Sequence, residues 1–126
     1  MPKNLLWIVI GAVVVLSIGT LVVFNNFSKP EINASDIILF YGKDCPHCKI
    51  VDEYVAENKV EDKVKFTRLE VSENRNNSNL LVEKAKICGL DINQIGVPFL
   101  WNGQSCFMGD PDVIKFFKDE INKSNQ

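Results

Sequence analysis

Blocks of like charge, internal repeats and any surplus of basic residues are all missing from the sequence. The chain carries 14 basic and 16 acidic residues, for a formal net charge of −2, and the two signs are interspersed. Because binding to nucleic acid needs a basic patch or stripe, this pattern argues against a nucleic-acid partner. With 126 residues, the chain has room for one compact domain and little else.

Charge is also absent from residues 5–24. About 20 apolar residues suffice to cross the hydrocarbon core of a bilayer as a helix. A cleaved signal peptide has a shorter apolar core and a cleavage site of small residues, and a buried helix of a globular domain has a polar stripe. The run fits neither alternative as well. We therefore predict a transmembrane signal anchor over residues 5–24, after a short tail over 1–4 and before a linker over 25–35.

Few charges flank this uncharged run. Lys3 precedes it, whereas Lys29, Glu31 and Asp36 follow it. The positive-inside rule favours a cytoplasmic N-terminus for this distribution. The domain would then lie outside the cytoplasm, where thiols can be kept oxidised and where four cysteines in a small domain are expected. The sequence thus predicts a single-pass protein of the cell membrane with an extracytoplasmic domain.

Hydrophobic patterning predicts seven elements in the domain, which we place over residues 36–123. Residues 36–41 form a continuous apolar run, typical of a strand that is buried on both faces of a sheet. Further strands are predicted over 63–71, 97–101 and 104–108, and helices over 46–58, 77–88 and from 110 onward. The resulting order is βαβαββα, which predicts an α/β domain.

Cys45 and Cys48 form a CxxC pair at the predicted start of a helix. This spacing brings both sulfurs within bonding reach and puts Cys45 beside the unpaired N–H groups and partial positive charge of the helix N-terminus. Cys45 is therefore the predicted attacking thiol and Cys48 the resolving thiol. Pro46 suits the first helical turn, and we expect His47 to favour the Cys45 thiolate through a hydrogen bond or a positive charge.

A CxxC pair also occurs in metal and haem sites. Haem attachment would need a histidine at position 49, which is Lys49, and structural zinc would need two further ligands, for which only Cys88, Cys106 and His47 remain. We expect a redox-active disulfide, with no metal and no other cofactor. A thioredoxin-like carrier that holds copper or another soft metal through the two thiolates stays an open alternative.

Cys88 and Cys106 allow two interpretations. Cys88 shares a predicted helix face with Leu81 and Ala85, and Cys106 lies on a predicted strand, so both cysteines suit small buried core positions. In an oxidising compartment they also suit a structural disulfide, if their Cα atoms lie close enough. The sequence leaves both possibilities open.

Residues 36–122 resemble the thioredoxin superfamily, and most closely its glutaredoxin branch. Residues 41–48 (YGKDCPHC) resemble the active-site segment, and Gly96-Val97-Pro98 resembles the loop that carries a cis-proline. The resemblance implies a three-layer sandwich around a mixed four-stranded sheet. It also implies that Pro98 lies against the disulfide, and that Val97, Pro98 and Tyr41 contact the substrate.

The Pro46-His47 dipeptide is the one found in the bacterial oxidase DsbA, so this similarity implies oxidising chemistry. Leu39 stands where thioredoxins carry a buried acid, so proton transfer from Cys48 would need another base or water. The resemblance implies a membrane-anchored thiol:disulfide oxidoreductase that exchanges disulfides with protein thiols. A membrane redox partner, such as a quinone-linked disulfide oxidase, is the expected source of oxidising equivalents.

Overall fold

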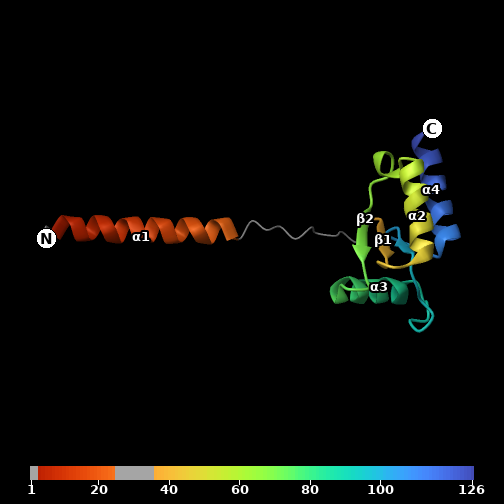
Figure 1. The fold of residues 1–126 in the computed structure, drawn as a ribbon, viewed down its shortest axis with the longest axis horizontal. Helices are drawn as coiled ribbons and strands as arrows, with labels where there is room; N and C mark the ends of the chain where they lie inside the picture. Colours follow the sequence, from red (N-terminus) through yellow and green to blue (C-terminus); the bar gives the residue numbers. More distant parts are fainter. Residues whose placement is uncertain (1–2, 25–35) are drawn as a thin grey trace. The chain divides into compact units, whose positions relative to one another are not determined.

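The computed structural model describes residues 3–24 and 36–126 (Figure 1). Contacts within the chain divide it into two compact units, Met1–Ile32 and Asn33–Gln126. The predicted linker over 25–35 and the first two residues of the predicted tail lie outside the described residues. The predicted domain over 36–123 falls within the second unit, which contains all the strands described below.

The N-terminal unit contains one helix, α1 (Lys3–Phe24), which covers the uncharged run. Within residues 3–24 and 36–126, however, no helix combines the length and the apolarity that crossing a membrane requires. The transmembrane helix in our predicted fold class is therefore wrong. That prediction depended on the length of the apolar, uncharged run and on its poor fit to a signal peptide or a buried helix, and the described helices do not supply the span. The corrected fold class is a small α/β domain with a four-stranded mixed sheet.

The sheet of the second unit has the strand order β2-β1-β3-β4. Its strands are β1 (Ile38–Tyr41), β2 (Thr67–Glu70), β3 (Phe99–Trp101) and β4 (Cys106–Met108). β1 pairs with β2 in parallel and with β3 in antiparallel orientation, and β3 and β4 form an antiparallel hairpin. The two central strands, β1 and β3, are the most buried, as their continuous apolar sequences require.

Helices cover both faces of this sheet. They are α2 (Pro46–Glu57), the short 3₁₀ helix η1 (Val60–Asp62), α3 (Arg75–Ile87) and α4 (Asp110–Ser124). Leu39 of β1 and its register partner Leu100 of β3 pack in one core cluster with the apolar faces of α2 and α4. On the opposite face, the ammonium of Lys84 in α3 lies 5.5 Å from the ring centre of Trp101 in β3. Figure 1 shows α2 and α4 side by side and α3 apart from them.

Several element boundaries differ from the predicted ones, and two of these differences have clear local reasons. α3 begins at Arg75, ahead of the predicted start at 77, because the Asn74 side chain caps it by accepting hydrogen bonds from the N–H groups of Asn76 and Asn77. β2 begins at Thr67, after the predicted start at 63, because the preceding residues follow η1 in a turn. The alternating sequence before Thr67 therefore does not extend the strand.

A disulfide joins Cys88, at the C-terminal end of α3, to Cys106 in β4, with the two Cα atoms 6.2 Å apart. Of the two interpretations that the sequence leaves open, the structure shows the disulfide. The bond ties α3 to the strand at one edge of the sheet, and its two cysteines lie 18 positions apart in the sequence. Such a cross-link restricts the unfolded chain and so stabilises the folded state.

We expect the Cys88→Ala/Cys106→Ala double variant to lose about 3 kcal/mol of unfolding free energy, because the chain between the two cysteines becomes unrestricted in the unfolded state. Urea denaturation of this variant and of the unaltered chain measures the difference. Cys45→Ala/Cys48→Ala is the matched control, since its bond closes a loop of only 3 positions. Equal losses in both double variants would contradict the assignment of Cys88–Cys106 as the main covalent brace.

Candidate redox site

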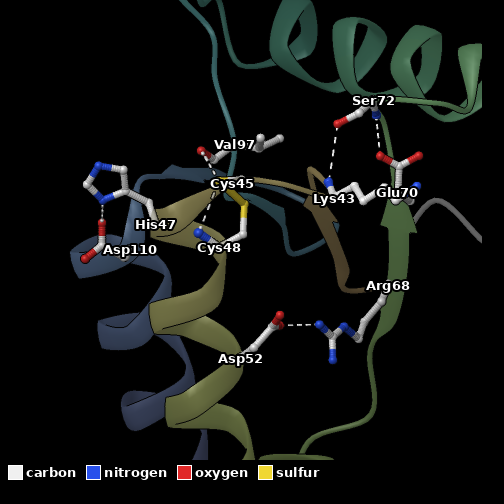
Figure 2. Close-up of a disulfide and its surroundings, with 10 residues drawn as sticks. All are labelled: Lys43, Cys45, His47, Cys48, Asp52, Arg68, Glu70, Ser72, Val97 and Asp110. Atoms are coloured by element: carbon white, nitrogen blue, oxygen red, sulfur yellow. Dashed lines mark hydrogen bonds and ion pairs between the residues drawn. A yellow bond between two sulfur atoms is a disulfide. The ribbon is translucent and has the colours of Figure 1, made fainter.

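Cys45 is the N-cap residue of α2, in extended backbone conformation with φ −89° and ψ 112°. Its sulfur accepts a hydrogen bond from the N–H of Cys48 at 3.1 Å, where a serine or aspartate oxygen caps most helices (Figure 2). Pro46 occupies the first helical position, where its missing N–H costs no hydrogen bond. The sequence C-P-H-C thus starts the helix and aims the helix N-terminus at the Cys45 sulfur.

Cys45 and Cys48 form a disulfide with their Cα atoms 5.2 Å apart. The two cysteines differ in access: Cys48 is only 3% exposed, whereas Cys45 is half-buried. An incoming thiolate must approach the sulfur that it attacks, so the exposure favours attack at Cys45 and departure of Cys48. The roles assigned from the sequence, with Cys45 as attacking and Cys48 as resolving thiol, stay a prediction.

The loop before β3 faces this disulfide. The Val97 carbonyl oxygen lies 3.4 Å from the Cys45 sulfur, and the Val97–Pro98 peptide bond is cis. Pro98 is buried, and its carbonyl oxygen accepts a hydrogen bond from the Gly109 N–H at 2.9 Å. The backbone group that contacts Cys45 is thus the Val97 carbonyl. Pro98 has no N–H to donate, and it holds the loop through the hydrogen bond that its own carbonyl accepts from Gly109.

Gly42 lies where three chain segments meet. A Cβ atom at this position would come within 3.0 Å of the Ser72 hydroxyl and 3.4 Å of both the Cys45 and Val97 side chains. The absence of a side chain therefore allows the cysteine loop, the loop after β2 and the Val97 loop to approach one another. The sequence analysis did not single out Gly42, although a glycine directly after a buried strand is the signal that points to such close approach.

The loop after β2 is held by a carboxylate that the sequence analysis also missed. Glu70 accepts hydrogen bonds from the backbone N–H groups of Glu73, at 2.9 Å, and Ser72, at 2.5 Å. These bonds lower the pKa of Glu70 below its ordinary value, and the bond from the Glu73 N–H has the largest effect. Desolvation acts in the opposite direction but does not outweigh them. The Ser72 hydroxyl in turn accepts a hydrogen bond from the N–H of Lys43, two residues before Cys45. A line of hydrogen bonds thus joins β2 to the cysteine loop.

His47 turns toward α4. Its Nδ1 lies 2.8 Å from the Asp110 carboxylate at the start of α4, and Figure 2 shows the ring pointing to Asp110 rather than to the sulfurs. The His47 side chain is 68% exposed, whereas that of Asp110 is 20% exposed. The sequence analysis expected His47 to act on Cys45 and gave Asp110 no part in the site. In the structure, the imidazole interacts with a carboxylate 63 positions along the chain.

A shallow groove of about 510 Å³ opens beside the disulfide. It is lined by both cysteines together with Tyr41, Gly42, Lys43, Asp44, Pro46, Lys49 and Asp52. The Arg68 guanidinium lies 5.2 Å from the ring centre of Tyr41 and forms an ion pair with Asp52, so it supports the side of the groove that these two residues line. Tyr41, which the resemblance places in contact with substrate, lines the groove. Val97 and Pro98, by contrast, belong to the loop before β3, from which the Val97 carbonyl contacts Cys45.

Within residues 3–24 and 36–126, no group of three or more histidine, cysteine, aspartate and glutamate side chains is arranged to hold a metal ion. All four cysteines are joined in the two disulfides. The Cys45–Cys48 disulfide is compatible with redox chemistry.

We expect Gly42→Ala to lower the unfolding free energy by about 1 kcal/mol, because the new methyl group pushes the Ser72 hydroxyl away from the Lys43 N–H. It should also slow reduction of the Cys45–Cys48 disulfide by dithiothreitol, since Cys45 and Val97 are displaced. Urea denaturation and the rate of reduction measure the two effects.

Gly96→Ala is the matched control for this prediction, since nothing lies within 4 Å of a Cβ atom at that position. We expect it to leave both quantities nearly unchanged. Equal effects of the two substitutions would show that close packing at Gly42 does not hold the site.

Comparison with known proteins does not assign the chain to a family. No protein-family model matches the chain, and the curated proteins include no match to it.

Proposed function

We propose that the protein is a thiol:disulfide oxidoreductase that resembles the thioredoxin superfamily. The observation that carries the proposal is the placement of a half-buried Cys45 as the N-cap of α2, in a disulfide with the buried Cys48. A CxxC disulfide at a helix N-terminus combines an accessible sulfur with a leaving thiolate that stays within reach. The groove beside it and the Val97 carbonyl opposite it leave room for a polypeptide thiol.

We propose the oxidising direction, in the following steps. A substrate thiolate attacks the Cys45 sulfur, the Cys45–Cys48 bond breaks, and Cys48 leaves as a thiolate. A second substrate thiolate then attacks the substrate sulfur of the mixed disulfide, and Cys45 leaves as a thiolate. The substrate gains a disulfide and the protein gains two electrons, so a partner disulfide oxidase, for example a quinone-linked one, must reoxidise the pair.

Two features favour oxidation over reduction. The N–H of Cys48 donates to the Cys45 sulfur, and the same bond stabilises a Cys45 thiolate in the reduced protein. Whatever stabilises the reduced form makes the disulfide a stronger oxidant. Leu39, which is 1% exposed in the core, stands where thioredoxins carry a buried acid, so the step of a reductive cycle in which Cys48 attacks the mixed disulfide lacks that base.

An oxidising, extracytoplasmic compartment is part of the same proposal. Both pairs of cysteines are joined, including the pair that ties α3 to β4. Disulfides of this kind persist outside the cytoplasm and are rare in reducing compartments. The proposed substrates are therefore protein thiols in that compartment.

The two cysteines should give different variant phenotypes. We expect Cys45→Ser to lose exchange completely, because the accessible sulfur is gone. In Cys48→Ser, by contrast, the mixed disulfide between Cys45 and the substrate has no resolving thiol, so it should accumulate. Non-reducing gels and intact mass measure both outcomes after incubation of the reduced variants with an unfolded protein that carries disulfides, which the Cys45 thiolate of Cys48→Ser can attack. Cys88→Ala/Cys106→Ala serves as the control and should keep exchange activity; equal residual activity in Cys45→Ser and Cys48→Ser would overturn the assigned roles.

The reduction potential tests the oxidising direction. Equilibration of the full chain with glutathione buffers should give a value near or above about −180 mV, as for strong protein oxidants. A value near about −270 mV, that of thioredoxin, would contradict this direction. Copper analysis of the same sample covers the carrier alternative: tightly bound stoichiometric copper with little exchange would overturn the proposed activity.

A further inference from the structure

We propose that Asp110 is a positioning residue that limits the oxidising power of the Cys45–Cys48 disulfide by holding His47 away from Cys45 and balancing its charge. The inference rests on the proposed function, because it concerns the same disulfide. It concerns a residue that is distant in sequence from the CxxC motif and belongs to another helix.

The contact joins the N-termini of two helices. His47 lies in the first turn of α2, which Cys45 caps, and Asp110 begins α4, which packs against α2. Imidazole Nδ1 and carboxylate Oδ1 are 2.8 Å apart. A hydrogen bond of this length fixes the ring toward α4, as Figure 2 shows.

Asp110 is held by the loop that faces the disulfide. Gly109, directly before it, has φ +89° and donates its N–H to the Pro98 carbonyl at 2.9 Å. Val97, next to Pro98, presents its carbonyl oxygen 3.4 Å from the Cys45 sulfur. The position of the carboxylate is therefore linked to the position of the sulfur through these two contacts and the peptide bonds Gly109–Asp110 and Val97–Pro98. With 20% of its side chain exposed, Asp110 is also more enclosed by its surroundings than the 68% exposed ring that it holds.

The sign of the effect is the same in both protonation states of His47. With a charged imidazole, the pair has no net charge, and with a neutral imidazole it carries one negative charge. Removing the carboxylate charge makes the pair one unit more positive in either state, which favours a Cys45 thiolate in the reduced protein. A favoured thiolate means a more oxidising disulfide. Releasing the ring adds to this effect, because the imidazole is then free to turn toward the sulfur.

Other charged groups surround this end of α2. They are Lys43 and Asp44 in the loop before the helix, Lys49 on the helix and Asp112 in the first turn of α4. All four are exposed, and Lys43 is engaged in an ion pair with Glu73 at 2.8 Å. Water and salt screen exposed charges more than partly buried ones, so Asp110 has the strongest local influence on His47.

Two substitutions of the full chain separate holding from charge. Asp110→Asn keeps an oxygen that accepts the imidazole N–H but loses the charge, whereas Asp110→Ala loses both. The measured quantity is the equilibrium constant between the Cys45–Cys48 disulfide and glutathione at pH 7. We expect the constant for reduction to rise about threefold in Asp110→Asn and about tenfold in Asp110→Ala, the latter equal to about 30 mV for a two-electron couple.

The same substitutions in a His47→Gln background provide the decisive comparison. If Asp110 acts by holding His47, Asp110→Ala and Asp110→Asn should then have equal, smaller effects. Asp112→Asn, a neighbouring acid in the same helical turn, is the matched control and should leave the constant nearly unchanged. Effects of Asp110→Ala that are the same with and without His47, or no larger than that of Asp112→Asn, would overturn the inference.

This equilibrium does not depend on catalysis, so the two proposals fail separately. Loss of the proposed function would show as no exchange between the unaltered chain and reduced protein substrates. Failure of the inference would show as an unchanged constant in Asp110→Ala while the unaltered chain exchanges normally.

Discussion

The hydrogen bond from the Cys48 N–H to the Cys45 sulfur is the interaction on which the site depends. Because of this bond, the Cys45 sulfur is both the cap of α2 and the reacting atom of the proposed function. A change at the start of α2 would therefore also change the position of that atom. The bond exists because β1 delivers the chain at this point: Ile38, Leu39 and Phe40 are fully buried between helices on both faces of the sheet. Close packing on both faces fixes the position of this strand, and it therefore also fixes where the following loop begins.

Long-range contacts then complete what the local sequence begins. The absence of a side chain at Gly42 lets the Ser72 and Val97 loops come close to Cys45. The Glu70 carboxylate holds the Ser72 loop by accepting hydrogen bonds from its backbone N–H groups. Each contact is modest, since the groups are partly exposed, but all restrain the same few residues. The Cys88–Cys106 bond acts elsewhere, between α3 and the edge strand β4. In the proposed function the two disulfides therefore have different roles: Cys88–Cys106 stabilises the domain, and Cys45–Cys48 is the reacting bond.

The sequence predicted those parts of this arrangement that neighbouring residues determine. The buried strand at Ile38–Tyr41 and the CxxC pair at a helix start are local patterns, and both lie in the structure where the sequence places them. The partners of those residues come from elsewhere in the chain. Asp110 reaches His47 across 63 positions, and Ser72 reaches Lys43 across 29, so no periodicity or spacing reveals either contact. Uncharged residues 5–24 show the opposite failure, because a pattern that is clear in composition did not yield a membrane span among the described helices.

The proton on Cys48 explains why an apolar residue at Leu39 matters for direction. During oxidation of a substrate, Cys48 departs as a thiolate in a position only 3% exposed, where burial disfavours the charge until a proton arrives. The groove that both sulfurs line gives water access to this end of α2, so the proton can come from solvent without a dedicated acid. During reduction of a substrate, Cys48 must instead lose its proton while it attacks the mixed disulfide; water is again the available acceptor, and burial disfavours the thiolate that forms. Burial of Cys48, with no carboxylate at position 39 to take its proton, therefore favours the oxidising direction within the proposed function.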